Sequence, residues 1–149
     1  MFLNQETFCT IIDNTPLISI DLIVKNHQGQ VLLGKRNNPP AKNFWFVVGG
    51  RIRKNEKIAD AFIRLTHQEL GQSFSLNKAR FIAPYQHFYD DSILGDDIAT
   101  HYVVLAYELV VDDLNDLPIE QHSDYRWFDI DELMIDIEVH QYTKDYFKE

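Results

Sequence analysis

A basic loop that contains two glycines, followed by a helix-like segment, is the stretch best suited to chemistry. The apolar run 46–48 ends in the two glycines at 49–50, and the basic residues of 51–54 follow. Beyond them, apolar residues recur at the spacing of one helical face, namely at Ile58, Ala61, Phe62 and Leu65. Gly71 is the expected end of that helix. We therefore expect a strand, a tight loop and a helix, a combination that suits a phosphate or metal site.

One face of the expected helix carries the candidate metal ligand. Positions 65, 68 and 69 are spaced so that they point in roughly one direction, and they are Leu65, Gln68 and Glu69. Glu69 is the only carboxylate among them. The alternative, that Glu69 is simply exposed near the helix end, is disfavoured because an anion is poorly placed there. The Gly49 carbonyl is a second candidate ligand, since glycine allows close approach to the backbone.

Three arginines lie around the loop and could bind phosphate through their guanidinium forks. They are Arg36, Arg51 and Arg53. Arginines beside a glycine turn are often only solvated charges, and this alternative applies most to Arg53. Arg64 and Glu56 are expected to pair with each other and to brace the loop against the helix.

Composition excludes several classes of protein. The chain has 149 residues, which fits one domain with a sizeable core, and its formal net charge of −9 argues against a nucleic-acid partner. Its single cysteine, Cys9, precludes an internal disulfide and fits a reducing compartment. The N-terminus lacks the features of a signal peptide, and no run approaches the roughly 18 apolar residues that span a bilayer. We expect a cytoplasmic protein without a membrane partner.

Periodicity and turn signals predict the elements that hold the loop. A short helix over 4–13 is capped by Asn4, and a hairpin joins the strands 17–24 and 31–33. The further expected elements are strands at 44–48, 81–89, 101–111 and 125–128, a helix beginning at 129, and an amphipathic helix over 139–147. Strands on both sides of a central helix predict an α/β (α+β) sandwich with a mixed sheet.

The spacing within this central stretch resembles the Nudix box of the Nudix hydrolases. The matching residues are Gly50, Glu56, Arg64, Glu69 and Gly71. Leu65 and Gln68 stand where the family has glutamates. With its flanking segments, the sequence is similar to the GDP-mannose mannosyl hydrolase branch. The resemblance implies an α/β/α Nudix sandwich, and a single Nudix hydrolase domain over residues 1–149.

The resemblance also implies roles for residues outside the box. Arg36 and Arg51 match arginines that contact the diphosphate, and Tyr102 is placed to hydrogen-bond the leaving diphosphate. Gln121 matches a metal ligand on a mobile loop, and the adjacent His122 matches the general base. Because only one helix carboxylate remains, one Mg²⁺ per subunit is expected, with Mn²⁺ as a possible substitute.

Three further residues are candidates for substrate binding. Asp21 interrupts an apolar strand, which is costly unless the side chain is paired or faces a cleft. It could equally face outward from a half-exposed strand. His87 and Tyr89 match sugar-side or phosphate-side contacts of the branch, but as alternating strand residues they could equally serve in packing.

The resemblance implies a hydrolase that releases GDP and free sugar from GDP-mannose, or from GDP-glucose, by attack of water at C1 with inversion. One alternative is a Nudix pyrophosphohydrolase that cleaves a P–O–P bond of a nucleoside diphosphate derivative. Another is a nucleotide-sugar sensor without catalytic activity. The resemblance also implies a homodimer.

Overall fold

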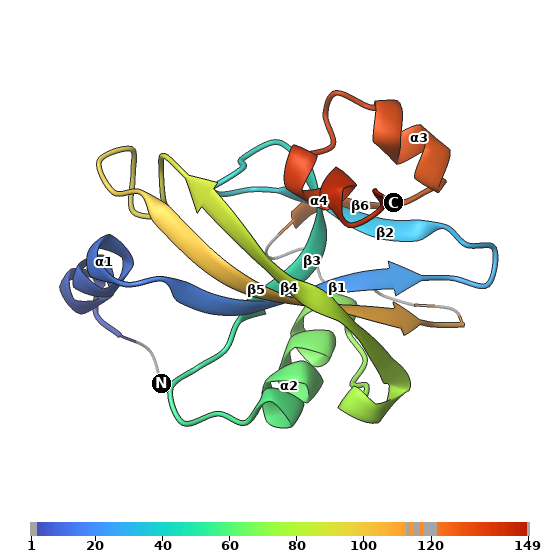
Figure 1. Cartoon of the computed structure of the whole chain (residues 1–149), viewed down its shortest axis with the longest axis horizontal. Helices are drawn as coiled ribbons and strands as arrows, with labels where there is room; N and C mark the ends of the chain where they lie inside the picture. The colour runs from blue at the N-terminus through green and yellow to red at the C-terminus, as the bar shows by residue number, and fades with distance from the viewer. Residues whose placement is uncertain (1–2, 113, 115–116, 118–121, 149) are drawn as a thin grey trace.

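A mixed six-stranded sheet forms the centre of the computed structural model, which describes residues 3–112, 114, 117 and 122–148 (Figure 1). The elements are α1 (Gln5–Asn14), β1 (Leu17–Lys25), β2 (Val31–Arg36), β3 (Trp45–Arg51), α2 (Ile58–Leu70), the 3₁₀ turn η1 (Leu76–Lys78), β4 (Ala79–Tyr89), β5 (Thr100–Val110), β6 (His122–Phe128), α3 (Ile130–Ile135) and α4 (Gln141–Asp145). The strand order is β4-β5-β1-β3-β2-β6, with β1 and β5 parallel and the other neighbours antiparallel. The predicted mixed sheet is confirmed.

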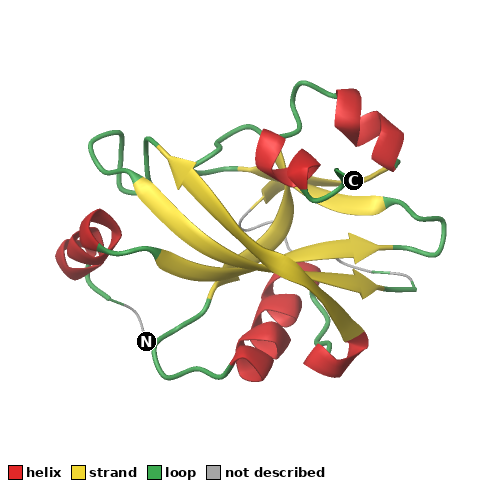
Figure 2. Ribbon diagram, viewed as in Figure 1, coloured by secondary structure: helices red, strands yellow, loops and turns green. Residues whose placement is uncertain are grey.

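Helices cover both faces of the sheet, as an α/β/α sandwich requires (Figure 2). Helix α2 lies on one face, and α3 and α4 lie on the other. Each face has its own apolar core. The core under α2 includes Ile20, Leu22, Val48, Ala61, Phe62 and Leu65. The core under α3 and α4 includes Ile23, Leu33, Val47, Leu133, Val139 and Tyr146.

Strand β1 lies inside the sheet between β5 and β3. Apart from Ile18 and Lys25, all of its residues are buried, because the strand is covered on both faces. Asp21 sits in the middle of this strand and is only 8% exposed. Its side chain therefore does not face outward from a half-exposed strand.

The hairpin predicted from the turn at 26–29 exists only at its base. Strands β1 and β2 pair at Lys25 and Val31, and beyond that point β3 lies between them. The first half of β3 pairs with β2, and its second half pairs with β1. Turn residues locate a chain reversal, but they do not determine which strand fills the space as the two arms diverge.

Both terminal helices form, with one change of length. Helix α1 is capped as predicted, since the Asn4 Oδ1 atom accepts a hydrogen bond from the Thr7 N–H at 2.8 Å. Helix α4 covers Gln141–Asp145 and is shorter than the predicted 139–147. No helix in the described part of the chain is long and apolar enough to cross a membrane.

Candidate active site

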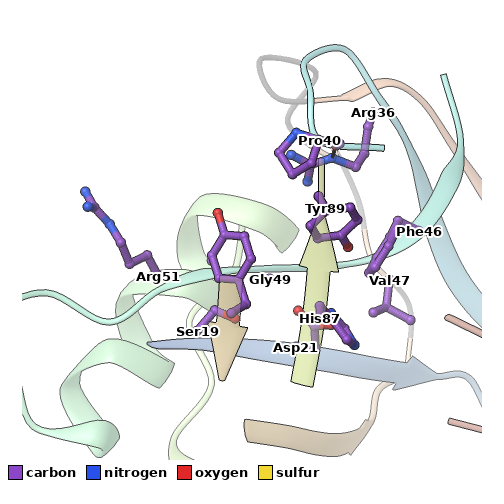
Figure 3. Close-up of a pocket in the computed structure, with 12 residues that line it drawn as sticks. Ser19, Asp21, Arg36, Pro40, Phe46, Val47, Gly49, Arg51, His87 and Tyr89 are labelled. Atoms are coloured by element: carbon purple, nitrogen blue, oxygen red, sulfur yellow. Dashed lines mark hydrogen bonds between the residues drawn. The ribbon is translucent and has the colours of Figure 1, made fainter. Parts of the chain in front are cut away.

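A pocket beside the last residues of β3 collects most of the predicted site residues (Figure 3). Twelve residues line it, and seven of them were predicted from the sequence: Asp21, Arg36, Gly49, Arg51, His87, Tyr89 and Tyr102. The other five are Ser19, Pro40, Phe46, Val47 and Gly50. Figure 3 shows Asp21 close to His87 at one end of the pocket and Arg36 beside Pro40 at the other. Anionic, neutral and cationic groups thus surround one space.

The two glycines allow strand, sheet and helix to approach one another at this point. A Cβ atom at position 49 would lie 2.2 Å from the Ile20 carbonyl oxygen, and one at position 50 would lie 2.4 Å from the Leu65 Cδ2 atom. Gly49 therefore permits the close approach of β1, and Gly50 permits that of α2.

The ladder between β1 and β3 determines where the Gly49 backbone points. The Ile52 N–H donates to the Ile18 carbonyl, so these two residues form a hydrogen-bonded pair. Such pairs alternate along an antiparallel ladder, and in this register Asp21 and Gly49 form a non-hydrogen-bonded pair. The Gly49 N–H and C=O therefore point away from β1. The N–H bonds to the Glu69 carboxylate.

Glu69 reaches this position from the buried face of α2. Its side chain is 2% exposed, and it does not itself line the pocket. The pKa of Glu69 is raised to about 7, chiefly by burial and also by the charge on Asp21, whereas the hydrogen bond from Gly49 and the charge on Arg36 oppose the rise. Bringing a cation to this carboxylate would relieve that penalty.

Positions 65, 68 and 69 were predicted to share one face of the helix, but in the structure they do not all point the same way. Leu65 and Glu69 are buried, but Gln68 is exposed, and its Oε1 atom accepts a hydrogen bond from the Arg64 Nη1 atom at 3.1 Å. Ile58, predicted on the apolar stripe, is the first residue of the helix and is 42% exposed.

Asp21 is held by a residue that the sequence analysis did not identify. The Tyr146 hydroxyl donates a hydrogen bond to the Asp21 Oδ2 atom. Burial raises the pKa of Asp21 to about 7, against the opposing effects of this hydrogen bond and of the Arg36 charge. The Asp21 Oδ1 atom lies 2.9 Å from where a Cβ of Gly49 would be, so this oxygen faces the pocket.

His87 both lines the pocket and takes part in packing, so its two predicted alternatives coexist. Its ring stacks on Tyr142 with centroids 4.2 Å apart and an interplanar angle of 4°. Burial lowers the pKa of His87 to about 4, helped by the nearby His140. The imidazole is therefore neutral at physiological pH and offers one donor and one acceptor.

The two predicted phosphate-binding arginines lie at different edges of the pocket. The Arg36 Nε atom donates to the Pro40 carbonyl at 2.8 Å, which fixes the direction of its guanidinium. The Arg51 guanidinium lies over the Phe8 ring of α1, 4.4 Å from the ring centroid. Arg53 does not line this pocket; it belongs to a neighbouring groove that Arg51 also lines.

The predicted pairing of Arg64 with Glu56 is confirmed. The Arg64 Nε and Nη2 atoms each donate to the Glu56 carboxylate at 2.8 Å, and Nη2 also donates to the Arg51 carbonyl at 2.9 Å. The Arg64 hydrogen bond lowers the pKa of Glu56 to about 2. This ion pair braces the glycine loop against α2.

Tyr89 and Tyr102 face each other edge to face, with ring centroids 6.4 Å apart. Burial raises the pKa of both hydroxyls, and the neighbouring Asp21 charge adds to that effect. Both groups are therefore neutral hydroxyls that can donate a hydrogen bond to a substrate oxygen.

The last two predicted residues fall at the edge of what the structure describes. Gln121 lies outside the described residues, and so does the side chain of His122. The backbone of His122 is described: it begins β6 and pairs with Arg36. Strand β6 thus starts three residues earlier than the predicted 125–128. Its first residue pairs with Arg36, which lines the pocket.

The donor set fits a dication that keeps part of its own hydration. Among the described residues there is no group of three or more His, Cys, Asp or Glu side chains that could hold a metal. Mg²⁺ is usually bound through one or two carboxylates together with waters and substrate phosphates. The Glu69 carboxylate beside the Gly49 backbone meets that requirement.

Sequence analysis missed the contribution of the C-terminal helix region. Tyr142 and Tyr146 are four residues apart and both turn toward the pocket residues. The amphipathic pattern of 139–147 predicted a packed helix face. The only available signal for more was that this face carries two hydroxyl-bearing aromatic residues.

Comparison with known proteins places this geometry in a family. Residues 15–148 match the NUDIX domain family. The chain is 40% identical over 119 residues to the low-salt glycan biosynthesis protein Agl8 of Haloferax volcanii, an alignment that covers 80% of this chain and 74% of that protein.

Solved structures share the fold at low sequence identity. The MutT protein of Methanosarcina mazei superposes with a TM-score of 0.71 at 16% identity, covering 90% of this chain and 92% of that one. A MutT NUDIX hydrolase of Burkholderia pseudomallei gives a TM-score of 0.69 at 22% identity, covering 89% and 95%. The NUDIX domain of Shewanella oneidensis NrtR, solved with ADP ribose, gives 0.61 at 16% identity, covering 89% and 87%.

Proposed function

The chain belongs to the NUDIX domain family and is a Nudix hydrolase, and on this premise we propose that it hydrolyses GDP-mannose at the glycosidic C–O bond. The products would be GDP and free sugar, with inversion at C1. GDP-glucose is the second substrate that the proposal admits.

The observation that carries the proposal is the depleted carboxylate face of α2. Leu65 is buried beneath Gly50, Gln68 is engaged by Arg64 on the exposed side, and Glu69 is the one carboxylate that reaches the Gly49 backbone. Attack of water at phosphorus by the usual Nudix route draws on several carboxylates of this face. A site with one such carboxylate is better suited to assisting a diphosphate as it leaves carbon.

The leaving diphosphate would be stabilised by cations and a neutral donor. Arg36 and Arg51 line the pocket from β2 and β3, and guanidinium groups match phosphate oxygens with two parallel hydrogen bonds. Tyr102 adds a hydroxyl that its raised pKa keeps protonated. Charge that develops on the departing GDP would thus meet donors already in place.

The metal-binding residues in the proposal are Glu69, the Gly49 carbonyl and Gln121. One Mg²⁺ bound there would supply positive charge to the diphosphate, and Mn²⁺ could replace it. Glu69 is already placed at the Gly49 backbone by helix α2, so this part of the site is preorganised.

His122 is the proposed general base. A histidine imidazole can act as a general base that takes a proton from water. The pairing of the His122 backbone with Arg36 supports this role, because it puts the residue beside a strand that lines the pocket. His87 is less suited to it, because burial has lowered its pKa to about 4.

Asp21, His87 and Tyr89 are the proposed sugar-side contacts. A carboxyl group can accept hydrogen bonds from sugar hydroxyls when ionised and donate one when protonated, whereas its ionised form repels phosphate, so Asp21 suits a sugar better than a diphosphate. His87 lies at the same end of the pocket as Asp21 (Figure 3).

Two relatives support a substrate of the nucleotide-sugar kind. Agl8 is named for glycan biosynthesis. The NUDIX domain of NrtR was solved with ADP ribose, a nucleoside diphosphate joined to a sugar.

Product identification separates the proposed reaction from its alternatives. Purified protein is incubated with GDP-mannose and Mg²⁺, and the products are followed by ¹H and ³¹P NMR. GDP with free mannose of inverted configuration is the expected result. GMP with mannose 1-phosphate would instead establish the pyrophosphohydrolase, and binding without either product would establish the sensor.

We also propose that the protein acts as a homodimer. The proposal rests on its similarity to the mannosyl hydrolase branch. Sedimentation at micromolar concentration should give twice the mass of the 149-residue chain. A single species of monomer mass would contradict the homodimer and leave the proposed reaction untouched.

A further inference from the structure

We propose that Tyr146 is a positioning residue: it holds one oxygen of Asp21 so that the other is presented to the sugar end of the pocket. The effect of this positioning on catalysis rests on the function proposed above. The positioning itself rests only on the contacts of the C-terminal segment.

The two oxygens of Asp21 have different surroundings. Oδ2 accepts the hydrogen bond from the Tyr146 hydroxyl, whereas Oδ1 lies over Gly49 on the pocket side. A carboxylate fixed at one oxygen cannot rotate, so its second oxygen keeps one direction. Tyr146 is 8% exposed and Asp21 is equally buried, so water does not compete strongly for this bond.

The hydroxyl of Tyr146 also lies near the second sugar-side candidate. It is 3.5 Å from the Nε2 atom of His87. The single proton of the hydroxyl goes to Asp21, which leaves an oxygen lone pair facing the imidazole. Tyr146 therefore connects Asp21 of β1 with His87 of β4, two strands that are not neighbours in the sheet.

The segment that carries Tyr146 is tied to the strand that carries Gly49. The Trp45 N–H donates to the Glu138 carbonyl at 2.8 Å, and the His140 N–H donates back to the Trp45 carbonyl at 3.0 Å. The Val47 N–H donates to the Thr143 hydroxyl at 3.1 Å. These bonds fix the position of the segment relative to β3, and hence the position of the Tyr146 hydroxyl relative to the pocket.

The Tyr146 ring is held independently of its hydroxyl. It packs edge to face on Tyr85, with ring centroids 4.7 Å apart and planes at 87°. Replacing Tyr146 by Phe should therefore keep the packing and remove only the hydrogen bond. Tyr85→Phe is the matched control, because it removes one hydroxyl from the same aromatic pair without touching Asp21.

The test compares Tyr146→Phe, Tyr85→Phe, Asp21→Asn and the double variant Asp21→Asn/Tyr146→Phe. Steady-state kinetics use GDP-mannose with Mg²⁺, calorimetry measures the Kd for GDP, and melting temperature monitors folding. Misplacing a substrate-positioning group by about 1 Å can cost about 10²-fold in activity. We expect Tyr146→Phe to lose that much in kcat/KM, while its Kd for GDP and its melting temperature stay close to those of Tyr85→Phe.

The double variant distinguishes positioning from general packing. If Tyr146 acts through Asp21, adding Tyr146→Phe to Asp21→Asn should cause little further loss. Losses that multiply would overturn the proposal. So would a Tyr146→Phe variant as active as Tyr85→Phe.

A structural readout works without any substrate. In a crystal structure of Tyr146→Phe, the Asp21 carboxylate should turn away from the orientation it has in the unmodified protein. An unmoved carboxylate overturns the positioning role even if GDP-mannose is hydrolysed as proposed. If the unmodified protein does not hydrolyse GDP-mannose, the proposed function fails, and the Asp21 orientation still decides the role of Tyr146.

Discussion

Among single residues, Glu69 and Asp21 have the environments least expected from their types. Both are buried carboxylates whose pKa is raised to about 7, and each is near the positive charge of Arg36. A folded protein keeps such groups at a cost in stability, so their retention fits a role with a cation or substrate.

Glu69→Gln should separate the metal role from a structural one. The folded-state pKa of Glu69, about 7, lies above the value of 4.5 that applies to the unfolded chain. The folded state therefore keeps its proton where the unfolded state has lost it, and the free energy of unfolding falls as pH rises from about 4.5 to 7. Without metal, Glu69→Gln should be more stable than the original protein at pH 8, by about 1–3 kcal/mol, and equal to it near pH 4.

Glu69→Gln should also lose the stabilisation that Mg²⁺ gives to the folded protein. Mg²⁺ at millimolar concentration should raise the melting temperature of the unmodified protein, because a ligand that binds only the folded state stabilises it. Glu69→Gln should show little of this increase. A variant that melts lower at every pH, or that responds equally to Mg²⁺, would contradict the assigned role.

His122→Gln tests the proposed general base. Removing such a base typically lowers kcat by about 10²- to 10⁴-fold with modest change in binding. We expect that loss with the Kd for GDP nearly unchanged, measured by steady-state kinetics and calorimetry. His27→Gln is a control, since His27 contacts Asp112 and lies outside the pocket. Near-full turnover of His122→Gln would remove this residue from the mechanism.

The sequence could indicate seven of the twelve pocket residues. Asp21 interrupts an apolar strand, Gly49 allows close approach to the backbone, and the other five match residues of a known family. Tyr146 could not be found in this way. It is 125 positions from Asp21 in the chain, and no local pattern links an aromatic residue near the C-terminus to a carboxylate in the first strand.

Among the secondary-structure elements, the junction of β3 with α2 determines the geometry of the site. Strand β3 carries the two glycines directly before its last residue, Arg51, and the Arg64–Glu56 pair fixes the loop that follows. Residues of three elements, β1, β3 and α2, thus meet within contact distance.

The two glycines should differ sharply in their tolerance of alanine. At position 49 the added Cβ would meet the backbone carbonyl of Ile20, which cannot move without displacing β1. At position 50 it would meet the end of the Leu65 side chain, which can change rotamer. Gly50→Ala should cost about 1–3 kcal/mol in the free energy of unfolding, and Gly49→Ala should cost more.

Urea denaturation measures both losses. Gly50→Ala should cost less stability in a Leu65→Ala background than in the unmodified protein, because Leu65→Ala removes the group that the new methyl contacts. Equal losses for the two glycine variants would contradict the separate roles assigned to them.

Element boundaries were predicted more closely than element neighbours. The strands and helices follow from periodicity and capping residues such as Asn4 and Gly71. The insertion of β3 between β1 and β2 depends on how the sheet twists, which adjacent residues do not record. The same limit applies to Gln68, whose contact with Arg64 turns it away from the face that its spacing suggested.

In the molecule as a whole, the positive charge in the pocket contrasts with the negative net charge of the chain. The chain carries a net charge of −9, yet the pocket contains Arg36 and Arg51. An acidic protein that binds a diphosphate must concentrate its cations locally, and the sheet does this by bringing Arg36 of β2 and Arg51 of β3 to different edges of the same pocket. Composition argued against a nucleic-acid partner, but only the fold brings these two arginines to one site.

The position of the bond that is broken is the central claim, and isotope labelling tests it most directly. GDP-mannose is hydrolysed in H₂¹⁸O with Mg²⁺, and the nucleotide product is analysed by mass spectrometry. Attack of water at C1 predicts GDP without ¹⁸O, because the phosphates keep all of their original oxygens. Appearance of ¹⁸O in GDP, or formation of GMP with mannose 1-phosphate, would contradict the account.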